Sequence, residues 1–176
     1  MGLDIVAYSN IKKERKIEDE DDEYENYDIT IYSNSSFVYQ LGSLNVNTHY
    51  SKTKNSKVQS FRIGSYSTYN GWRNDLSIMA GYISAESVWD DFKDNLRYYK
   101  LKEIINEKVI MKPFYEIIFF SDCDGVIGPE ISKKLYDDFL LFDETAKKEN
   151  EYFYRIYSIF KDAFKIASDN GLVLFG

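Results

Sequence analysis

Residues 151–175 read EYFYRIYSIFKDAFKIASDNGLVLF, and this stretch decides the fold class. Over Glu151–Asn170 apolar side chains recur at helical spacing, which predicts an amphipathic helix with one buried face. Asn170-Gly171 is typical of a helix C-terminus, because both residue types tolerate a left-handed backbone. Leu172–Phe175 is short and apolar and predicts a final strand. The expected buried stripe of the helix consists of Phe153, Ile156, Tyr157, Phe160, Phe164 and Ala167.

The rest of the chain mixes strands and helices without regular alternation. Helices are expected from about Trp72, from Ser87 to the break at Pro113, and from Ile131. We find no internal repeat and no domain boundary. We therefore expect an α+β fold, a single domain over residues 1–176 with a small, mostly antiparallel sheet packed against three to four helices. The other expected strands are Leu3–Tyr8, Asp28–Tyr32, Phe37–Leu41, Val58–Ile63 and Phe114–Phe120.

Length and composition fit one domain in a reducing compartment. A chain of 176 residues can bury a full core, and its 44% of hydrophobic residues argues against wholesale disorder. Cys123 is the single cysteine, which excludes an internal disulfide and a zinc site built from cysteines. No apolar run reaches about 18 residues, so we expect no transmembrane helix. The N-terminus lacks the features of a signal peptide, and the expected location is the cytoplasm.

The net charge of −7 comes from one segment. Residues 18–25 hold seven acids in eight positions, and removing these from the 29 acids leaves 22, equal to the 22 Lys and Arg. Like charges at this density resist packing, so we expect an acidic loop over residues 10–27. The alternative is a docking patch for a basic partner protein. Net acidity also argues against broad nucleic-acid binding, which depends on clusters of Lys and Arg.

A second, polar loop is expected over residues 42–57, with its mobile part around residues 45–57. His49 lies there with no obvious partner in the sequence. We therefore expect His49 at the surface rather than as a metal ligand or a base.

Residues 64–73 gather hydrogen-bonding groups at an expected strand-to-helix junction. Gly64 and Gly71 permit tight turns, and a helix N-terminus offers free N–H groups that suit a phosphate or carboxylate. The glycine spacing fits neither a Walker P-loop nor a dinucleotide fingerprint. An ordinary capped helix start, with Arg73 in an ion pair, explains the segment equally well. The candidate ligand-binding residues are Ser65, Tyr66, Ser67, Tyr69, Asn70, Trp72 and Arg73, among which the rings would stack a base and Arg73 would hold an anion.

Residues 117–128 read IIFFSDCDGVIG and form a second junction. Taken alone, they resemble the first motif of the haloacid dehalogenase superfamily, in which a nucleophilic Asp and an acid/base Asp share a magnesium site. That resemblance implies these roles for Asp122 and Asp124. The context argues against it, because the motif normally opens that domain, whereas 121 residues precede Asp122 here. The alternative is a turn whose carboxylates cap the next helix or pair with Arg73. The candidate ligand-binding residues are Ser121, Asp122, Asp124 and Gly125.

Several segments of the chain form a recognisable set in combination. They are Met1-Gly2-Leu3-Asp4, Gly64-Ser65-Tyr66-Ser67 with Tyr69-Asn70 and Trp72-Arg73, Phe120-Ser121-Asp122 with Gly125 and Ile127-Gly128, and Asn170-Gly171 near the end. The set resembles a family of uncharacterised phage and bacterial proteins. The resemblance covers both ends and most of the chain after residue 60, and it is weak over residues 10–60 and 84–110. It brings no activity, cofactor or catalytic residue, but it implies a phage or prophage origin and hence the host-cell cytoplasm.

Three functions follow as hypotheses. The favoured one is an accessory protein that binds a small anionic ligand without a cofactor, and that in a phage would sequester a nucleotide immune signal to counter host defence. The second is an inhibitor that docks its acidic run on a host defence protein. The third is a phosphohydrolase that uses magnesium at Asp122 and Asp124. The sequence leaves open whether the two polar junctions form one pocket, and an aromatic-rich domain can also form a homo-oligomer.

Overall fold

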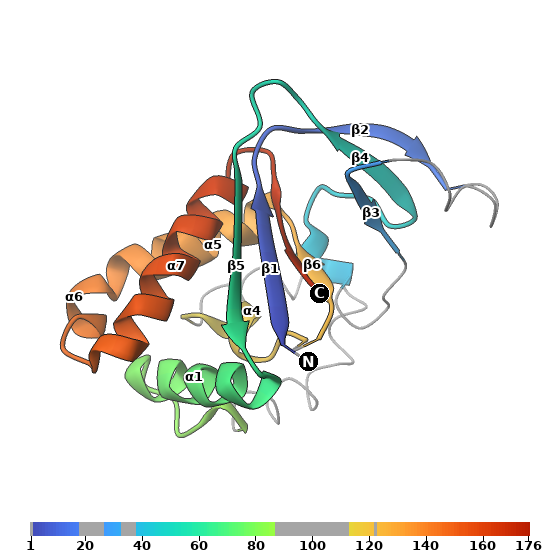
Figure 1. The fold of residues 1–176 in the computed structure, drawn as a ribbon. Helices are drawn as coiled ribbons and strands as arrows, with labels where there is room; N and C mark the ends of the chain where they lie inside the picture. Colours follow the sequence, from blue (N-terminus) through green and yellow to red (C-terminus); the bar gives the residue numbers. More distant parts are fainter. Residues whose placement is uncertain (1, 18–26, 33–37, 87–112, 122) are drawn as a thin grey trace.

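The computed structural model describes residues 2–17, 27–32, 38–86, 113–121 and 123–176. They form an α+β fold with two antiparallel sheets, one of four strands and one of three (Figure 1). The expected helix at Ser87–Pro113 lies almost wholly outside these residues. No helix in the described ranges has the length and apolar character needed to cross a membrane.

The four-stranded sheet has the order β5-β1-β7-β6. Its strands are β1 (Leu3–Tyr8), β5 (Val58–Gly64), β6 (Gly125–Ile127) and β7 (Leu172–Phe175), so three of the strands expected from the sequence are confirmed. Alternate residues point to opposite faces. One face carries side chains such as Ile5 and Val173 toward the helices, and the other carries Val126 and Leu172 toward the second sheet.

The second sheet has the order β2-β4-β3, with β2 (Ile11–Lys16), β3 (Ile29–Ile31) and β4 (Thr48–Lys52). The strand expected around Ile29 and Ile31 is confirmed. The expected loops over 10–27 and 42–57 are wrong in part, because each contains a strand. β2 and β4 pair with each other across more than thirty intervening residues, with Lys13 opposite Tyr50. This distant pairing turns polar segments that lack an apolar pattern into strands.

His49 is buried rather than at the surface, which corrects the sequence expectation. It lies in β4, its Nδ1 is 2.9 Å from the Oγ1 of Thr30, and its ring stacks on Tyr27 with the centroids 4.2 Å apart. These partners come from a different part of the chain, so the local sequence gave no sign of them.

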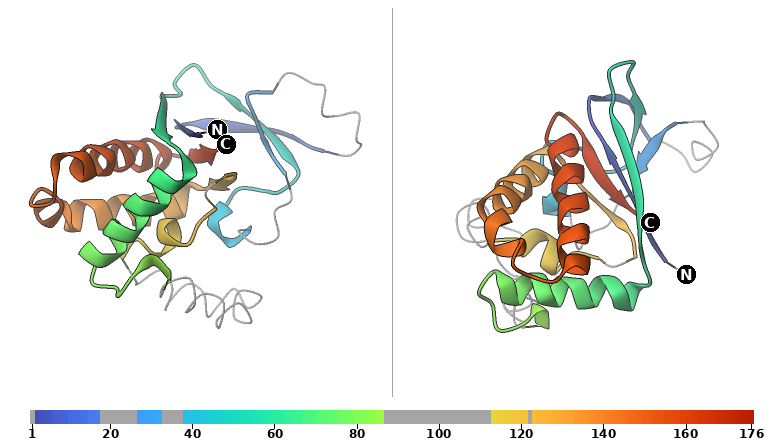
Figure 2. Two further views of the ribbon diagram at one scale, coloured as in Figure 1. Left: turned by 60° about the horizontal axis from the view of Figure 1, so that its bottom comes forward. Right: turned by 60° about the vertical axis from the view of Figure 1, so that its left-hand side comes forward.

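Two helices, α5 (Pro129–Leu141) and α7 (Glu151–Ala167), cover one face of the four-stranded sheet, and the short α6 (Asp143–Ala146) joins them beyond the sheet (Figure 2). α7 is confirmed with its expected buried stripe, and Asn150 caps it by accepting a hydrogen bond from the N–H of Phe153 at 2.9 Å. α1 (Tyr66–Met79) runs across one end of the sheet, near the chain termini.

Phe114–Phe120 does not form a strand. It contains α4 (Tyr115–Ile118), which follows a left-handed backbone at Phe114 with φ 55°. The N–H of Phe114 donates to the carboxylate of Asp138 on α5 at 2.8 Å. All seven residues are buried in the core, so a short apolar run here fits either structure, and tertiary contacts decide between them.

Two further boundaries differ from the sequence expectations. The segment Val38–Leu41 is a 3-10 helix, η2, rather than part of a strand. α1 starts at Tyr66 rather than near Trp72, because Ser65 acts as its N-cap by accepting a hydrogen bond from the N–H of Thr68. Most of the first polar segment is therefore helical.

Candidate functional site

The two polar segments lie at the same end of the four-stranded sheet. Gly64 at the end of β5 is opposite Leu3 at the start of β1. On the other side of β1, Ile5 is opposite Phe175, which in turn is opposite Gly125 at the start of β6. Neighbouring strands lie about 4.8 Å apart and residues along a strand about 3.4 Å apart, so three strand spacings and an offset of two residues place the junctions roughly 16 Å from each other. They share one end of the sheet, but β1 and β7 lie between them.

Arg73 links the two segments. Its guanidinium donates hydrogen bonds to the carbonyl of Phe120, the residue before Ser121, and to the side chain of Asn70. It also lies over the ring of Tyr69, with 4.5 Å between Cζ and the ring centroid. Arg73 thus connects α1 to the segment that precedes β6. An anion bound to Arg73 would have to compete with these hydrogen bonds and with the ring of Tyr69.

The structure places Tyr69 and Trp72 in the core, which corrects their expected role as ligand-stacking rings. Both are buried, and the Trp72 ring stacks on Phe160 of α7 with the centroids 4.8 Å apart. The ring of Tyr69 packs near Phe160 and Phe175. Once α1 starts at Tyr66, helical spacing turns these two positions toward the sheet and α7.

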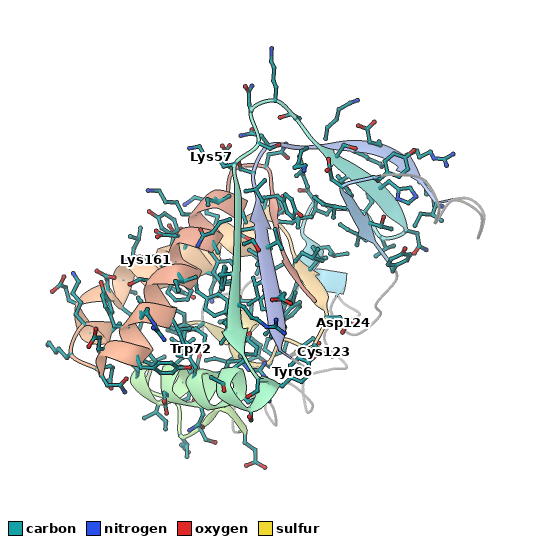
Figure 3. All side chains as sticks on the ribbon, in the orientation of Figure 1. Lys57, Tyr66, Trp72, Cys123, Asp124 and Lys161 are labelled. Carbon is teal, nitrogen blue, oxygen red and sulfur yellow. The ribbon has the colours of Figure 1, made fainter. Side chains whose placement is uncertain are left out.

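The exposed groups of the first segment gather at the start of α1. Ser65 and Ser67 are exposed, and their Oγ atoms are 2.7 Å apart, while Tyr66 is partly buried. Gly64 has φ +111° and makes the turn that was expected of it. Gly71 lies inside α1, so it makes no turn there, which corrects that expectation. The first segment therefore offers hydroxyl groups and a helix N-terminus, with Figure 3 showing Tyr66 at this end of the molecule.

The second segment is a compact polar turn before β6. The Oγ of Ser121 accepts hydrogen bonds from the N–H groups of Cys123 and Asp124, at 3.3 and 3.2 Å. It also donates to the carboxylate of Asp124 at 3.2 Å. Gly125 follows with φ +139°, and a Cβ there would meet the ring of Phe120. Asp122 lies outside the described residues. Asp124 is exposed at the rim of this turn (Figure 3).

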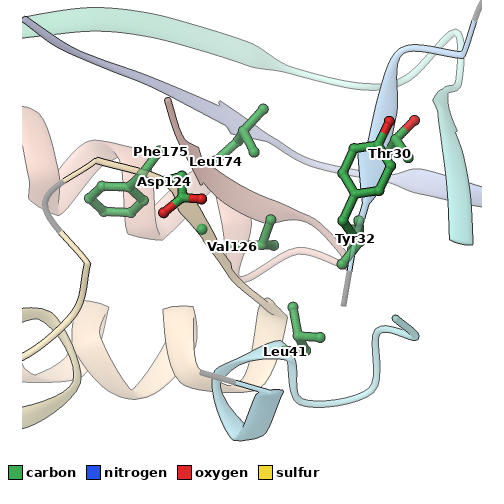
Figure 4. Close-up of a pocket in the computed structure, with 9 residues that line it drawn as sticks. Thr30, Tyr32, Leu41, Asp124, Val126, Leu174 and Phe175 are labelled. Carbon is green, nitrogen blue, oxygen red and sulfur yellow. The ribbon is translucent and has the colours of Figure 1, made fainter. Parts of the chain in front are cut away.

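A pocket of about 240 Å³ lies beside Asp124, where the edges of the two sheets meet (Figure 4). β6 is an edge strand of the four-stranded sheet and β3 is an edge strand of the three-stranded sheet. Among the described residues, apolar side chains make up most of the lining, and Asp124 supplies the one carboxylate. The lining residues are Thr30, Ile31, Tyr32, Leu41, Asp124, Gly125, Val126, Leu174 and Phe175.

Sequence reasoning found Asp124 and Gly125 but missed the rest of this lining. Leu174 and Phe175 belong to a strand that was expected. Because successive residues of a strand point to opposite faces of the sheet, the sequence predicts that these two side chains lie on opposite sides. Nothing local indicates that β3 and η2 come to lie beside β6. The pocket therefore depends on long-range pairing that a single sequence does not reveal.

A buried ion cluster joins α4 to α5, and no pattern in the sequence indicates it. Nζ of Lys134 lies 2.7 Å from Glu116 Oε2 and 2.8 Å from Asp138 Oδ2. Burial raises the pKa of Glu116 to about 7, although the charge of Lys134 opposes the shift. Burial also raises the pKa of Asp138 above its ordinary value. Gln40 of η2 donates to the carbonyl of Glu116 at 2.8 Å and so ties η2 to α4.

Within the described ranges, no three His, Cys, Asp or Glu side chains are grouped to hold a metal ion. Magnesium was expected only under the phosphohydrolase alternative, at Asp122 and Asp124, and Asp122 lies outside these ranges. In comparisons with known proteins, the chain matches no family model, no curated protein and no solved structure. The geometry of the pocket and its surroundings therefore carries the functional argument.

Proposed function

We propose that the protein binds a small organic ligand, such as a nucleotide, in the pocket between β3 and β6. The observation that carries the proposal is the make-up of the pocket: a mostly apolar space of about 240 Å³ with the exposed carboxylate of Asp124 at its rim. Ligand sites commonly combine an apolar lining with a few polar groups that fix orientation.

The carboxylate decides which part of a ligand enters. Asp124 accepts hydrogen bonds and repels anions, so a ring that bears N–H donors fits the pocket better than a phosphate does. A nucleobase has such donors on a flat apolar body. It would contact the side chains of Val126 and Leu174 while its N–H groups reach Asp124. The pocket thus favours the base of a nucleotide rather than its anionic part.

The anionic part of a nucleotide would lie outside the pocket, toward the start of α1. Ser65 and Ser67 are exposed there, at the same end of the four-stranded sheet as Asp124. Free N–H groups at a helix N-terminus favour phosphate oxygens. In the phage setting that the sequence resemblance implies, such a protein would sequester a nucleotide immune signal and so counter host defence.

Isothermal titration calorimetry with mono-, di- and cyclic nucleotides, each with and without magnesium, tests this proposal. We expect one nucleotide class to bind and to be recovered intact. Asp124→Asn should weaken that binding about tenfold or more, because a hydrogen bond to a charged group contributes roughly 1.5–3 kcal/mol. Asp162→Asn on α7 is the matched control, since Asp162 is exposed and lies away from the pocket lining.

Two results would contradict the proposal. One is the absence of binding across the whole panel. The other is equal affinity of the Asp124→Asn and Asp162→Asn proteins. If the nucleotide is instead consumed in the presence of magnesium, the phosphohydrolase alternative with Asp122 and Asp124 replaces simple binding.

A further inference from the structure

Positive charge gathers on the three-stranded sheet and on its connection to β5. Among residues 10–17, 27–32 and 42–57 there are seven Lys and Arg but only two acids, in a chain whose net charge is −7. The two acids, Glu14 and Asp28, form ion pairs with Lys12 and Lys52. We call the seven bases the basic ribbon, and they are Lys12, Lys13, Arg15, Lys16, Lys52, Lys54 and Lys57.

The strand β2 carries four of these bases along a sheet edge. Five of its six residues are exposed, and it pairs with β4 on one side. Lys13 is opposite Tyr50 and Lys16 is opposite Thr48. Tyr50 and Thr48 are two residues apart on β4 and share a face, and an irregularity in the register adds one residue to β2 between Lys13 and Lys16. These two lysines therefore point to the same side, roughly 7 Å apart. The bases on this strand therefore form a linear array.

The corner between β4 and β5 holds two more bases in a fixed place. Ser9 donates its N–H to the carbonyl of Lys57, and its Oγ accepts from the N–H of Lys57 at 2.9 Å. The hydroxyl of Ser56 donates to the carbonyl of Asn10 at 3.0 Å. These bonds tie residues 53–57 to the bend between β1 and β2, and Figure 3 shows Lys57 at this corner. Lys54 and Lys57 are both exposed.

Lysines on an edge strand can serve simply to prevent unwanted strand pairing. That explanation covers β2, but it does not cover Lys52, Lys54 and Lys57, which lie on β4 and in the corner. A linear array of bases suits a linear polyanion, whose phosphates repeat along a chain. Tyr32, at the end of β3, is 55% exposed and offers a ring on which a base can stack.

We infer that the basic ribbon binds single-stranded nucleic acid, with its Lys and Arg on the phosphates and Tyr32 on a base. A single strand fits better than a duplex, because only unpaired bases can stack on an exposed aromatic ring. None of the seven bases lines the pocket at Asp124, but Tyr32 does. This binding differs from the expectation drawn from net charge alone, because the structure shows that the charge is unevenly spread.

Fluorescence anisotropy with a labelled single-stranded oligonucleotide, over about 50–200 mM salt, tests the inference. In one variant Lys16, Lys54 and Lys57 are changed to Gln, and in the matched control Lys133, Lys148 and Lys165 on the helical side are changed to Gln. All six side chains are exposed, and both variants lose three charges. We expect the ribbon variant to bind at least tenfold more weakly at low salt, with the slope of log K against log salt lower by roughly one per Lys. The control should bind as the unaltered protein does.

A second measurement uses Tyr32→Ala with single-stranded and duplex probes of the same sequence. Loss of stacking should weaken the single-strand complex about fivefold or more and leave the salt slope unchanged. The inference is overturned if the oligonucleotide does not bind at low salt, or if the ribbon and control variants weaken equally. It is also overturned if the duplex or an acidic polypeptide binds as tightly as the single strand. Melting temperatures of all variants check that they are folded.

Discussion

The carboxyl group of Glu116 is fully buried, and its Oε1 has no hydrogen-bond partner in the part of the chain that the structure describes. Its Oε2 contacts Lys134, which also holds Asp138. Because desolvation disfavours the charged carboxylate, this group takes up a proton near neutral pH, at a pKa of about 7. The folded protein therefore binds this proton more tightly than the unfolded chain does.

This difference makes stability depend on pH in a definite direction. Between pH 4.5, the ordinary pKa of Glu, and about 7, the unfolded chain loses the proton while the folded protein keeps it. The contribution of Glu116 is therefore present below pH 4.5 and is lost as the pH rises to 7, which amounts to about 3 kcal/mol. Asp138 adds to the same trend, because burial raises its pKa too.

We predict that Glu116→Gln flattens the pH dependence of the free energy of unfolding above pH 5. The amide keeps the size of the side chain and has no charge to desolvate, while Lys134 keeps Asp138 as its partner. Urea unfolding at several pH values measures the effect. Asp28 and Asp143 do not interfere with this measurement. Their pKa values are lowered, so the stability that they contribute is lost only at more acidic pH. An equally steep decline in the variant would show that Glu116 is not the titrating group.

At the scale of elements, the junction of α7 and β7 is held by a close backbone approach. A Cβ on Gly171 would overlap the carbonyl oxygen of Tyr8, and Asn170 before it has φ 47°. The side chain of Asn170 donates to the carbonyl of Ile11 at 3.2 Å. The helix-ending Asn-Gly pair therefore also packs this turn against the bend between β1 and β2.

We predict that Gly171→Ala lowers the free energy of unfolding by about 2–4 kcal/mol, because the backbone of Tyr8 must move or the turn must open. Gly71→Ala is the matched control: a Cβ at Gly71 meets nothing within 4 Å, and the residue lies inside α1. Alanine there should stabilise the protein by roughly 0.5–1 kcal/mol. Chemical denaturation of both variants decides the matter, and similar effects of the two substitutions would contradict the packing argument.

Elements with a strong local pattern were predictable. The stripe of α7 and the apolar strands β1 and β7 follow from periodicity alone. Phe114–Phe120 was misassigned because six of its seven residues are aromatic or aliphatic and show no helical or strand period. The left-handed backbone at Phe114 had no signal in the sequence either. β2 and β4 were missed because their stability comes from pairing with each other. Local sequence determines α7, β1 and β7, whereas contacts with distant parts of the chain determine α4, β2 and β4.

At the scale of the whole molecule, the residues of the candidate site also fall into two groups, those indicated by local sequence and those brought in by distant contacts. Asp124 and Gly125 stood out because a polar turn after an apolar run is a local feature. Thr30 comes to the pocket on β3 and Leu41 on η2, through the packing of these segments beside β6, which no local pattern encodes. Tyr69 and Trp72 were assigned to a ligand because the start of α1 was placed too late. In the structure both residues lie within α1, on its buried face.

The distribution of charge over the chain leads to a last prediction. The acidic run at residues 18–25 follows β2 directly in the sequence and carries seven negative charges, against the seven bases of the ribbon. The run and a nucleic acid carry the same sign of charge, so each should reduce the attraction of the ribbon for the other. We predict that changing the seven acids to Asn and Gln raises the affinity for a single-stranded oligonucleotide.

The gain should be largest at low salt and should shrink as the salt concentration approaches about 1 M, where the screening length is roughly 3 Å. Anisotropy titrations of the unaltered and neutralised proteins over this range measure it. The control replaces seven exposed acids outside residues 18–25, because it matches the change in net charge but leaves that run intact. If both proteins gain equally, net charge alone controls the binding. If the affinity of neither protein rises, the acidic run does not affect binding by the ribbon. A docking patch for a basic partner protein is then the better explanation of the run, because such a patch need not affect nucleic-acid binding.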